Sequence, residues 1–188
     1  MFRILKGEKL INIPYIYEVC TTSQGIITLE EYVDGVLLDK ILEKKTLTRK
    51  EACNYATNIC DALSSLHSHG IIHCDIKPSN IIIGKDGKAN LIDLSISKSA
   101  NGDDMNSIPL GTPGFAAPEQ FGIAKIDYVT DIYALGVMLN IMLTGNHPTA
   151  KCYGGHLGKI ISKAISTEMS KRYKTAKDFK KALKFYTI

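Results

Sequence analysis

A single long helix with recognisable ends constrains this chain more than any other sequence feature. Thr48 and Glu51 have the spacing of a capping box, in which two side chains satisfy backbone amides at the first helical turn. From there to Leu66 the apolar residues recur at steps of three and four, which is the period of one helical face. Gly70 is the type of residue that most often ends a helix. The pattern predicts a long amphipathic helix between Thr48 and Gly70.

Two predicted hairpins lie on either side of this helix in the sequence. Residues 10–33 contain runs of β-branched and aromatic residues that are interrupted at Ser23-Gln24-Gly25. Residues 81–83 and 89–92 are two further apolar runs, and residues 84–87 between them form a Gly-Lys-Asp-Gly turn. Both patterns are typical of antiparallel strand pairs that are joined by a tight turn.

The second half of the chain has a loop pattern followed by helical patterns. Residues 95–118 are rich in Gly, Ser, Asn and Pro, and we expect a long surface loop there. From Asp131 an apolar helix is predicted to run to Leu143. Further helical patterns occur around 156–166 and from about 176 to 185.

Composition describes an ordinary globular chain. A chain of 188 residues with 45% hydrophobic and 22% charged side chains can bury a core, so we expect one domain over residues 1–188. The net charge of +4 is mild and the C-terminal lysines have helical spacing, so we expect a solvated face and no nucleic-acid partner. The apolar run 135–143 is too short to cross a bilayer, so no membrane segment is expected. The five cysteines form no C-x-x-C pair, which predicts free thiols and a cytoplasmic location.

The run His73-Cys74-Asp75-Ile76-Lys77-Pro78-Ser79-Asn80 places an acid, a cation and an amide between the long helix and the second hairpin. A lone His-Asp pair is more often structural, but Asp, Lys and Asn within one loop indicate a ligand. Asp75 can accept a hydroxyl proton, Lys77 can steady a phosphate, and Asn80 can hold a metal. Asp93 follows the second hairpin and adds another hard oxygen ligand of the kind that magnesium prefers. This set suits phosphoryl transfer.

Five segments, taken in order, resemble a eukaryotic-type serine/threonine protein kinase, and the wording from Leu110 to Gln120 is especially similar to small bacterial members of that family. The resemblance implies an α+β, protein kinase-like fold. Residues 34–188 would be a mainly helical C-lobe, and residues 1–33 would be the hinge with a remnant of the β-rich N-lobe. Glu31-Tyr32-Val33-Asp34-Gly35 looks like the hinge, and His73 to Asn80 looks like the catalytic loop. Asp93-Leu94-Ser95 looks like the metal-binding triplet, and Ala117-Pro118-Glu119 looks like the end of the activation segment. Asp131 to Gly136 looks like the start of the central helix.

The resemblance also implies a role for individual residues. Asp75 would be the catalytic base, and Lys77 would contact the γ-phosphate of ATP. Asn80 and Asp93 would bind Mg²⁺. Lys77 together with Thr112 implies serine or threonine rather than tyrosine as the acceptor, and hence a protein substrate that presents those hydroxyls.

The implied ATP site lies next to these residues. Backbone groups of Glu31 and Val33 would bind adenine, with Ile82 as an apolar floor beneath it. The complete set of implied cofactor-binding residues is Glu31, Val33, Lys77, Asn80, Ile82 and Asp93. Further along the chain, Arg172 is a plausible ion-pair partner for Glu119. Such a pair would fix the C-terminal end of the predicted loop 95–118 and would have a structural role.

The chain departs from the family pattern inside the motifs. Cys74 stands where the usual Arg precedes the catalytic Asp, so a phosphate added to the loop lacks its common partner. We therefore predict that phosphorylation of Ser107 or Thr112 is not the main switch. Leu94 and Ser95 replace Phe and Gly of the usual triplet. Leu94 can fill the same apolar slot, whereas Ser95 restricts a backbone that Gly leaves free.

The largest departure is at the N-terminus, where neither a Gly-rich loop nor a nucleotide-binding Lys on a strand precedes the hinge. The missing N-lobe would lie upstream in the natural gene, lie on a partner chain, or be lost, and residues 1–188 alone are expected to bind nucleotide weakly. A serine/threonine protein kinase is the leading reading, and a pseudokinase-like scaffold or binding module is the alternative. A small-molecule phosphotransferase is less favoured, because Ala117-Pro118-Glu119 belongs to a surface that is shaped for peptides.

Overall fold

The computed structural model describes residues 2–23, 25–100, 110–122 and 124–187. The α-helices are α1 (Phe2–Leu5), α2 (Leu38–Leu42), α3 (Arg49–Ser68), α4 (Tyr128–Thr144), α5 (Gly155–Ala164) and α6 (Ala176–Leu183). The strands are β1 (Ile16–Thr22), β2 (Gly25–Glu30), β3 (Gly35–Leu37), β4 (Ile71–Ile72), β5 (Ile81–Gly84), β6 (Ala89–Leu91) and β7 (Lys98–Ser99). Short 3₁₀ turns are η1 (Pro78–Asn80), η3 (Pro118–Phe121), η4 (Met169–Lys171) and η5 (Lys184–Tyr186).

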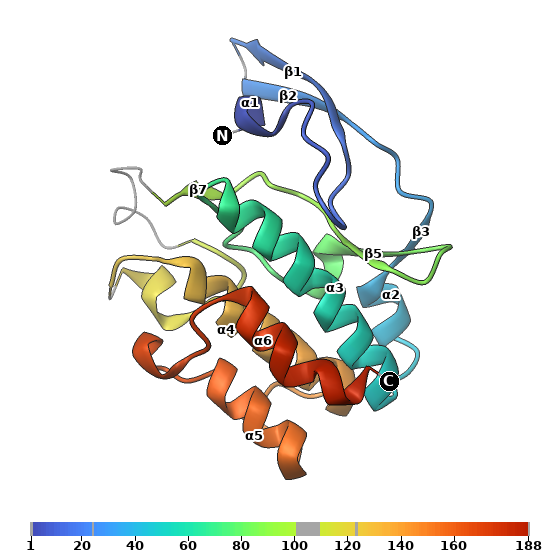
Figure 1. Cartoon of the computed structure of the whole chain (residues 1–188), viewed down its shortest axis with the longest axis vertical. Coiled ribbons are helices and arrows are strands. Elements are labelled where there is room, and N and C mark those ends of the chain that lie inside the picture. Colours follow the sequence, from blue (N-terminus) through green and yellow to red (C-terminus); the bar gives the residue numbers. More distant parts are fainter. Residues whose placement is uncertain (1, 24, 101–109, 123, 188) are drawn as a thin grey trace.

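The helices form one body, and the β1–β2 hairpin stands above it with α1 (Figure 1). Helix α3 runs through the body and contacts both α4 and α6, while α5 packs on α4. The N-terminus lies beside the hairpin, and the C-terminus lies at the opposite end of the body, near the start of α3 (Figure 1). The hydrophobic core therefore sits between helices, as in a layered helical domain.

Helix α3 confirms the prediction made from its capping residues. The Thr48 hydroxyl accepts the Glu51 amide at 3.3 Å, and the Glu51 carboxylate accepts the Thr48 amide at 2.9 Å. Gly70 adopts a φ of 72° just after the helix, a conformation that glycine adopts without strain. The apolar face is buried along the whole length of the helix, from Ala52 to Leu66. This face packs against α4 and α6 and forms part of the core.

Helix α4 begins three residues earlier than the predicted start at Asp131. Asp127 caps it, and the side chains of Asp127 and Thr130 form a capping box with the backbone. The C-terminal end at Thr144 lies one residue beyond the predicted Leu143, and Gly145 follows it at a φ of 70°. Helix α4 is buried on nearly every side, so other parts of the chain surround it. The helices predicted around 156–166 and 176–185 are present as α5 and α6, followed by η5.

Both predicted hairpins are present, and the second one is larger than expected. Strands β1 and β2 pair antiparallel from Ile16–Glu30 to Thr22–Gly25, with one irregularity near Tyr17. Strands β5 and β6 pair as predicted around the Gly84–Gly87 turn. Strand β3 joins β5 on its other edge, and α2 follows β3 directly. A strand of three residues and a helix of five are too short to carry a periodic signal, so the sequence pattern did not predict them.

Within its described residues, 95–100 and 110–118, the predicted loop contains strand β7 and the first residue of η3, which corrects that expectation. Strand β7 pairs antiparallel with β4, so that Ile71 lies opposite Ser99 and Ile72 opposite Lys98. Residues 101–109, including Ser107, lie outside the described residues. The segment 110–117 has no helix or strand. In the part of the chain that is described, no helix is long and apolar enough to span a membrane.

Candidate active site

Asp75 lies at the centre of a closed set of hydrogen bonds. Its Oδ2 atom is 2.7 Å from Lys77 Nζ and accepts Asn80 Nδ2 at 3.0 Å. Its Oδ1 atom accepts the Thr112 hydroxyl at 2.7 Å, and that hydroxyl in turn accepts Lys77 Nζ at 2.8 Å. The structure thus brings together four side chains that the sequence analysis selected, although Thr112 is 37 residues away from Asp75.

The protein environment keeps the Asp75 carboxyl ionised at neutral pH. Its burial acts to raise the pKa, but the hydrogen bonds from Lys77 and Thr112 and the Lys77 charge outweigh it, so the pKa lies below its ordinary value. Residue Asp75 is 8% exposed, which leaves an edge open to solvent. An ionised, partly accessible carboxylate beside an ammonium group is suited to accept a proton from a hydroxyl near a phosphate.

Asn80 and Asp93 each retain an oxygen that can serve a metal ion. The Asn80 amide nitrogen donates to both the backbone oxygen and the carboxylate of Asp75, so its Oδ1 atom faces away from Asp75. The Asp93 Oδ1 atom accepts the Ser95 amide at 3.1 Å, while Oδ2 has no partner among the described residues. The two segments are linked, because the Ile92 amide donates to the Asn80 carbonyl at 3.0 Å. Two hard oxygens fit Mg²⁺, which completes its shell with phosphate and water.

Asp93 adopts a φ of 64°, a left-handed conformation that is uncommon for residues other than glycine. The neighbouring residue Leu94 is 6% exposed and fills the apolar slot that was expected for it. The hydrogen bond from the Ser95 amide to the Asp93 carboxylate stabilises this conformation. The residue in the left-handed conformation is therefore Asp93, and its side chain is held by the backbone amide of Ser95, the residue that replaces the usual Gly.

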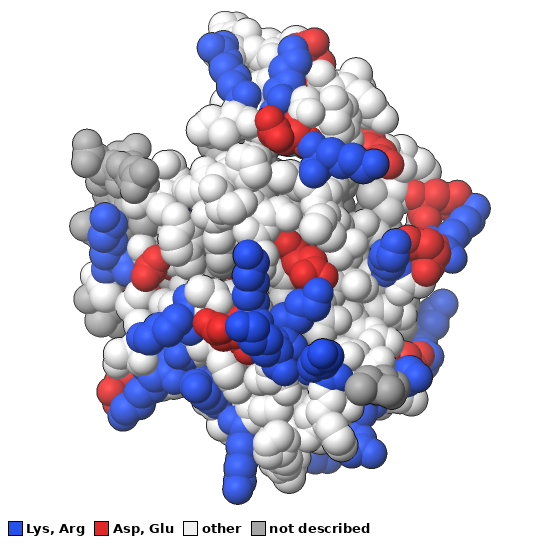
Figure 2. Space-filling view, in the orientation of Figure 1, with Lys and Arg blue, Asp and Glu red and all other residues white. Residues whose placement is uncertain are grey.

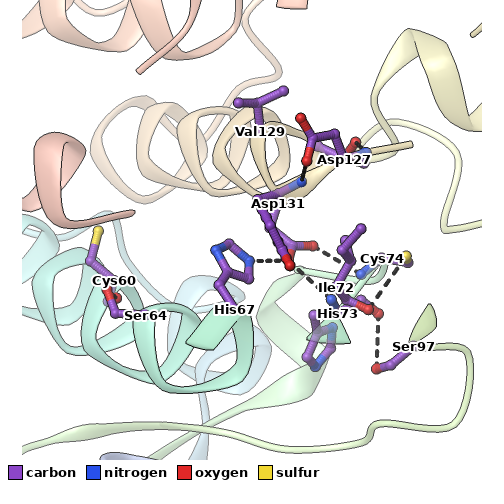
Figure 3. Close-up of polar contacts among 12 residues, drawn as sticks. Cys60, Ser64, His67, Ile72, His73, Cys74, Ser97, Asp127, Val129 and Asp131 are labelled. Atoms are coloured by element: carbon purple, nitrogen blue, oxygen red, sulfur yellow. Dashed lines mark hydrogen bonds and ion pairs between the residues drawn. The ribbon is translucent and has the colours of Figure 1, made fainter. Parts of the chain in front are cut away.

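Asp131 holds the loop that carries Asp75, and the sequence analysis gave this carboxylate no role. Its two oxygens accept the backbone amides of His73 and Cys74, each at 2.9 Å, and Oδ2 also lies 2.8 Å from His67 Nε2. Figure 3 shows the contacts of Asp131 with His67, His73 and Cys74. Asp131 is fully buried. A sequence signal for this role was that Asp131 begins the segment that resembles the start of the central helix in the kinase pattern.

The same segment has an unusual backbone and a buried, neutral histidine. Cys74 has a φ of 68°, and the Asp131 carboxylate stabilises this conformation through the Cys74 amide. His73 is fully buried; burial lowers its pKa, even though the carboxylate of Asp131 acts to raise it. Its Nε2 atom lies 3.3 Å from the Ile92 carbonyl, next to Asp93. His73 therefore connects the Asp75 segment to the Asp93 segment without carrying a charge.

Gln120 is a second positioning residue that sequence reasoning missed. Its Nε2 atom donates to the carbonyls of Cys74 at 2.8 Å and Leu110 at 3.1 Å, so it ties the segment that carries Thr112 to the segment that carries Asp75. Gly111 passes so close that a Cβ atom there would lie 2.6 Å from Gln120 Nε2. A side chain at Gly111 would thus displace Gln120 and, with it, the position of Thr112.

The predicted pair between Glu119 and Arg172 is confirmed and is fully buried. Arg172 Nη1 and Nη2 donate to the two carboxylate oxygens of Glu119 at 2.6 and 2.9 Å. Thr130 also donates to this carboxylate, and Arg172 donates further to the carbonyls of Val129 and Ser166. Every polar atom of the pair therefore has a partner, and the end of the 110–121 segment is fixed to α4.

Cys74 lies in a small apolar cluster at the place where the family pattern has an Arg. Its buried neighbours are Ile72 and Ile126, and Ile96 and Tyr128 pack against them. Burial raises the pKa of the Cys74 thiol, so it stays a neutral, apolar group. The described members of the cluster are apolar, but the charge of Lys98 acts on the Cys74 thiol from the neighbouring strand β7. Phosphorylation itself stays untested.

A cleft of about 840 Å³ separates the β1–β2 hairpin from the body. The backbone N–H of Val33 and the carbonyl of Glu31 have no protein partner within the described ranges, so both can bind a ligand. Glu31, Val33, Ile82 and Asp93 all line this cleft. Its lining includes three acidic residues, Glu30, Glu31 and Asp93, and no Lys or Arg among the residues that the structure describes. The cleft therefore offers donors and acceptors for a base but no cation for phosphates.

The predicted site residues thus fall into two neighbouring groups. Asp75, Lys77, Asn80 and Thr112 are joined by hydrogen bonds. The remaining predicted residues, Glu31, Val33, Ile82 and Asp93, line the cleft. Their individual roles in binding and transfer remain predictions.

Comparisons with known proteins show the family to which the chain belongs. The family model described as protein kinase domain matches residues 2–185. Serine/threonine-protein kinase D of Synechocystis sp. is 32% identical over 94% of this chain and 39% of its own length. A probable myosin light chain kinase of Dictyostelium discoideum is 34% identical over 77% of this chain and 38% of its own. A probable serine/threonine-protein kinase of Clostridium perfringens is 35% identical over 73% of this chain and 20% of its own length.

The chain belongs to the protein kinase family and is similar to serine/threonine kinases, including bacterial ones. It has an α+β kinase fold in which the N-terminal sheet is reduced to the β1–β2 hairpin over the residues described. The chain spans less than two fifths of the length of the three relatives named above.

Proposed function

We propose that this chain transfers the γ-phosphoryl group of Mg-ATP to serine or threonine hydroxyls of a protein. The observation that carries the proposal is the closed set of hydrogen bonds among Asp75, Lys77 and Thr112. An acceptor hydroxyl that replaces the Thr112 hydroxyl at Asp75 Oδ1 would meet an ionised carboxylate and an ammonium group at once. Its proton would pass to Asp75, and Lys77 would balance charge on the transferred group.

The remaining residues would position ATP and Mg²⁺. The Glu31 carbonyl and the Val33 amide would bind the adenine edge, and Ile82 would contact its face. Asn80 Oδ1 and Asp93 Oδ2 would hold Mg²⁺, which supplies positive charge to the phosphates when it is bound. The free oxygens and backbone groups at these positions support this assignment.

The acidic lining of the cleft implies that phosphates need an additional cation. Glu30, Glu31 and Asp93 disfavour a triphosphate by charge repulsion, and the cleft lining holds no basic residue within the described ranges. We propose that residues 1–33 are the hinge and an N-lobe remnant, residues 34–188 the C-lobe, and that a further N-lobe segment or a partner chain completes the phosphate site. The cytoplasmic location that the cysteines indicate is part of the same proposal.

The decisive experiment measures transfer of ³²P from γ-labelled ATP to a mixture of unstructured Ser/Thr-containing proteins, with and without Mg²⁺. Asp75→Asn removes the proton acceptor and keeps the shape, so transfer is expected to fall by about 10²- to 10⁴-fold. Calorimetric affinity for Mg-ATP should change far less. Asp86→Asn is the matched control, because Asp86 is an exposed turn residue whose partners lie in its own turn. Transfer that survives Asp75→Asn would contradict the proposed base.

A second candidate is a scaffold or binding module, and the acidic cleft is the observation that favours it. A protein that neither binds Mg-ATP nor transfers phosphate, and whose cellular function survives Asp75→Asn, would have this second function. The hydrogen-bonded set around Asp75 would then serve only to fix the 110–121 segment to the body.

A further inference from the structure

Lysines gather over α6 on the face of the molecule shown in Figure 2. There they surround a second cleft, of about 540 Å³, between α6 and α3. We call it the basic cleft, and its lining residues are Thr57, Asp61, Lys177, Lys180, Lys181, Lys184 and Thr187. It lies apart from the cleft beside the hairpin, with which it shares no lining residue.

The charges of the basic cleft are only partly balanced. Lys180 Nζ contacts both carboxylate oxygens of Asp61, at 2.6 and 2.7 Å, so this acid is occupied by one lysine. Lys181 is 3.6 Å from Asp178, a weak pair because the Lys181 side chain is 80% exposed. Lys177 and Lys184 have no carboxylate partner among the described residues. Two ammonium groups are therefore free, and a third is nearly free.

The spacing of these lysines places them along one groove. Steps of three and four residues from Lys177 through Lys180 and Lys181 to Lys184 put the side chains on the same side of α6 and η5. The Lys180–Asp61 pair joins α6 to α3 across 119 residues of sequence and fixes one wall. The result is a concave, positively charged surface on a rigid pair of helices.

We propose that the basic cleft binds an acidic, carboxylate-rich segment of a partner protein. A row of ammonium groups at helical steps matches carboxylates on an extended or helical peptide. A hollow favours a protruding segment over a flat anionic membrane. Among the residues that the structure describes, the lining contains no aromatic side chain on which the bases of a single-stranded nucleic acid could stack. The proposal does not depend on phosphoryl transfer and holds for a kinase or a scaffold.

Fluorescence anisotropy with two labelled peptides tests the proposal on the full chain. In one peptide glutamate alternates with glycine, and in the other glutamine replaces glutamate. We expect the glutamate peptide to bind and its affinity to fall as ionic strength rises from about 0.01 M to about 0.15 M. The double variant Lys177→Glu/Lys184→Glu is expected to weaken binding by about tenfold or more.

Two further variants separate the basic cleft from overall charge. Lys125→Glu/Lys159→Glu makes the same charge change at exposed lysines outside the cleft, and it should alter the affinity by less than about twofold. Asp61→Asn frees Lys180 and should tighten binding by about two- to fivefold. Circular dichroism checks that each variant is folded.

The proposal would be overturned by equal binding of the glutamine peptide, or by equal losses in both double variants. Tighter binding of duplex DNA or of vesicles of anionic lipid, lost in the same Lys177/Lys184 variant, would also overturn it, because the cleft would then serve a nucleic acid or a membrane.

Discussion

The β1–β2 hairpin and the helical body both contain apolar side chains, but the body buries many more of them than the hairpin does. Ile27 and Leu29 in β2 are each 62% exposed, whereas Leu63 and Leu66 in α3 are fully buried. The hairpin is a two-stranded sheet with little packed against it, and such a unit gains little stability from burial. The body encloses α4 on nearly every side. Most of the stabilisation by burial of apolar side chains therefore comes from the body.

This difference has a direct bearing on the site. Asp75, Lys77 and Thr112 belong to the body and are fixed by Asp131 and Gln120. The Glu31 and Val33 side of the cleft follows directly from β2, the less stabilised region. The hydrogen-bonded group around Asp75 is thus part of the packed body, whereas the other side of the cleft is less supported, and the following predictions test this contrast.

Breaking the buried ion pair of the body should have the largest effect. Glu119→Ala leaves the Arg172 guanidinium buried without its carboxylate, so the free energy of unfolding should fall by about 3–5 kcal/mol. Urea denaturation followed by circular dichroism measures it. Glu43→Ala breaks the exposed pair with Lys40 and should cost less than about 1 kcal/mol. Similar losses in both variants would show that the Glu119–Arg172 pair does not fix the body.

The same leucine truncation should have different results in the two regions. Leu66→Ala creates a cavity between packed helices and should lower the free energy of unfolding by about 2–5 kcal/mol. Leu29→Ala removes a side chain that is already largely in water, so the expected loss is less than about 0.5 kcal/mol. Denaturant midpoints of the two variants, measured side by side, test the comparison. A large loss at Leu29 would mean that the hairpin is packed against another surface.

Acid should destabilise the body through its buried carboxylates. Burial acts to raise the pKa of Glu119, but the Arg172 hydrogen bonds outweigh it, so the pKa in the folded protein is lower than in the unfolded chain. The stabilisation is therefore complete above pH 4.5, the ordinary value, and is lost as the pH falls through the lowered pKa. One such group contributes a slope of at most about 1.4 kcal/mol per pH unit.

Unfolding titrations of Glu119→Gln and Glu18→Gln between pH 7 and the acid range measure this contribution. Glu119→Gln should flatten the pH dependence in acid. The control is Glu18 in the hairpin, whose pKa is lowered by its Lys6 contact but whose side chain is exposed to solvent. Glu18→Gln should leave the slope unchanged, since an exposed pair is screened. If Glu18→Gln also flattened the dependence of unfolding free energy on pH, the hairpin would contribute to acid sensitivity as the body does, and the expected difference between the two regions would be wrong.

The sequence predicted the elements that have local signals. Helix α3 has both of its ends marked by Thr48, Glu51 and Gly70, and both hairpins have their turns marked by glycine. The predicted start of α4 was wrong because the prediction followed the apolar run that begins at Asp131. The residue that caps the helix, Asp127, precedes that run. Strands β4 and β7 were missed because two residues cannot show a period, and their pairing depends on tertiary contact.

The site divides in the same way. The motif spacing selected Asp75, Lys77, Asn80 and Thr112, which the structure joins by hydrogen bonds. The contacts of Asp131 and Gln120 with the His73–Cys74 backbone were not predicted, because these partners lie 46 to 58 residues away in the sequence. Backbone amides and carbonyls carry no sequence identity, so no residue pattern records such partners.

The Asp131 carboxylate also couples the order of folding to the assembly of the site. The amides of His73 and Cys74 find their acceptor only when α4 reaches the end of α3, and these contacts close loops of 58 and 57 residues. Contacts across such separations depend on prior loop closure, whereas α3 can form from local interactions. A chain in which α4 is not yet in place therefore has its long helix but no fixed position for Asp75. Docking of α4 on α3 and positioning of the Asp75 segment therefore occur together.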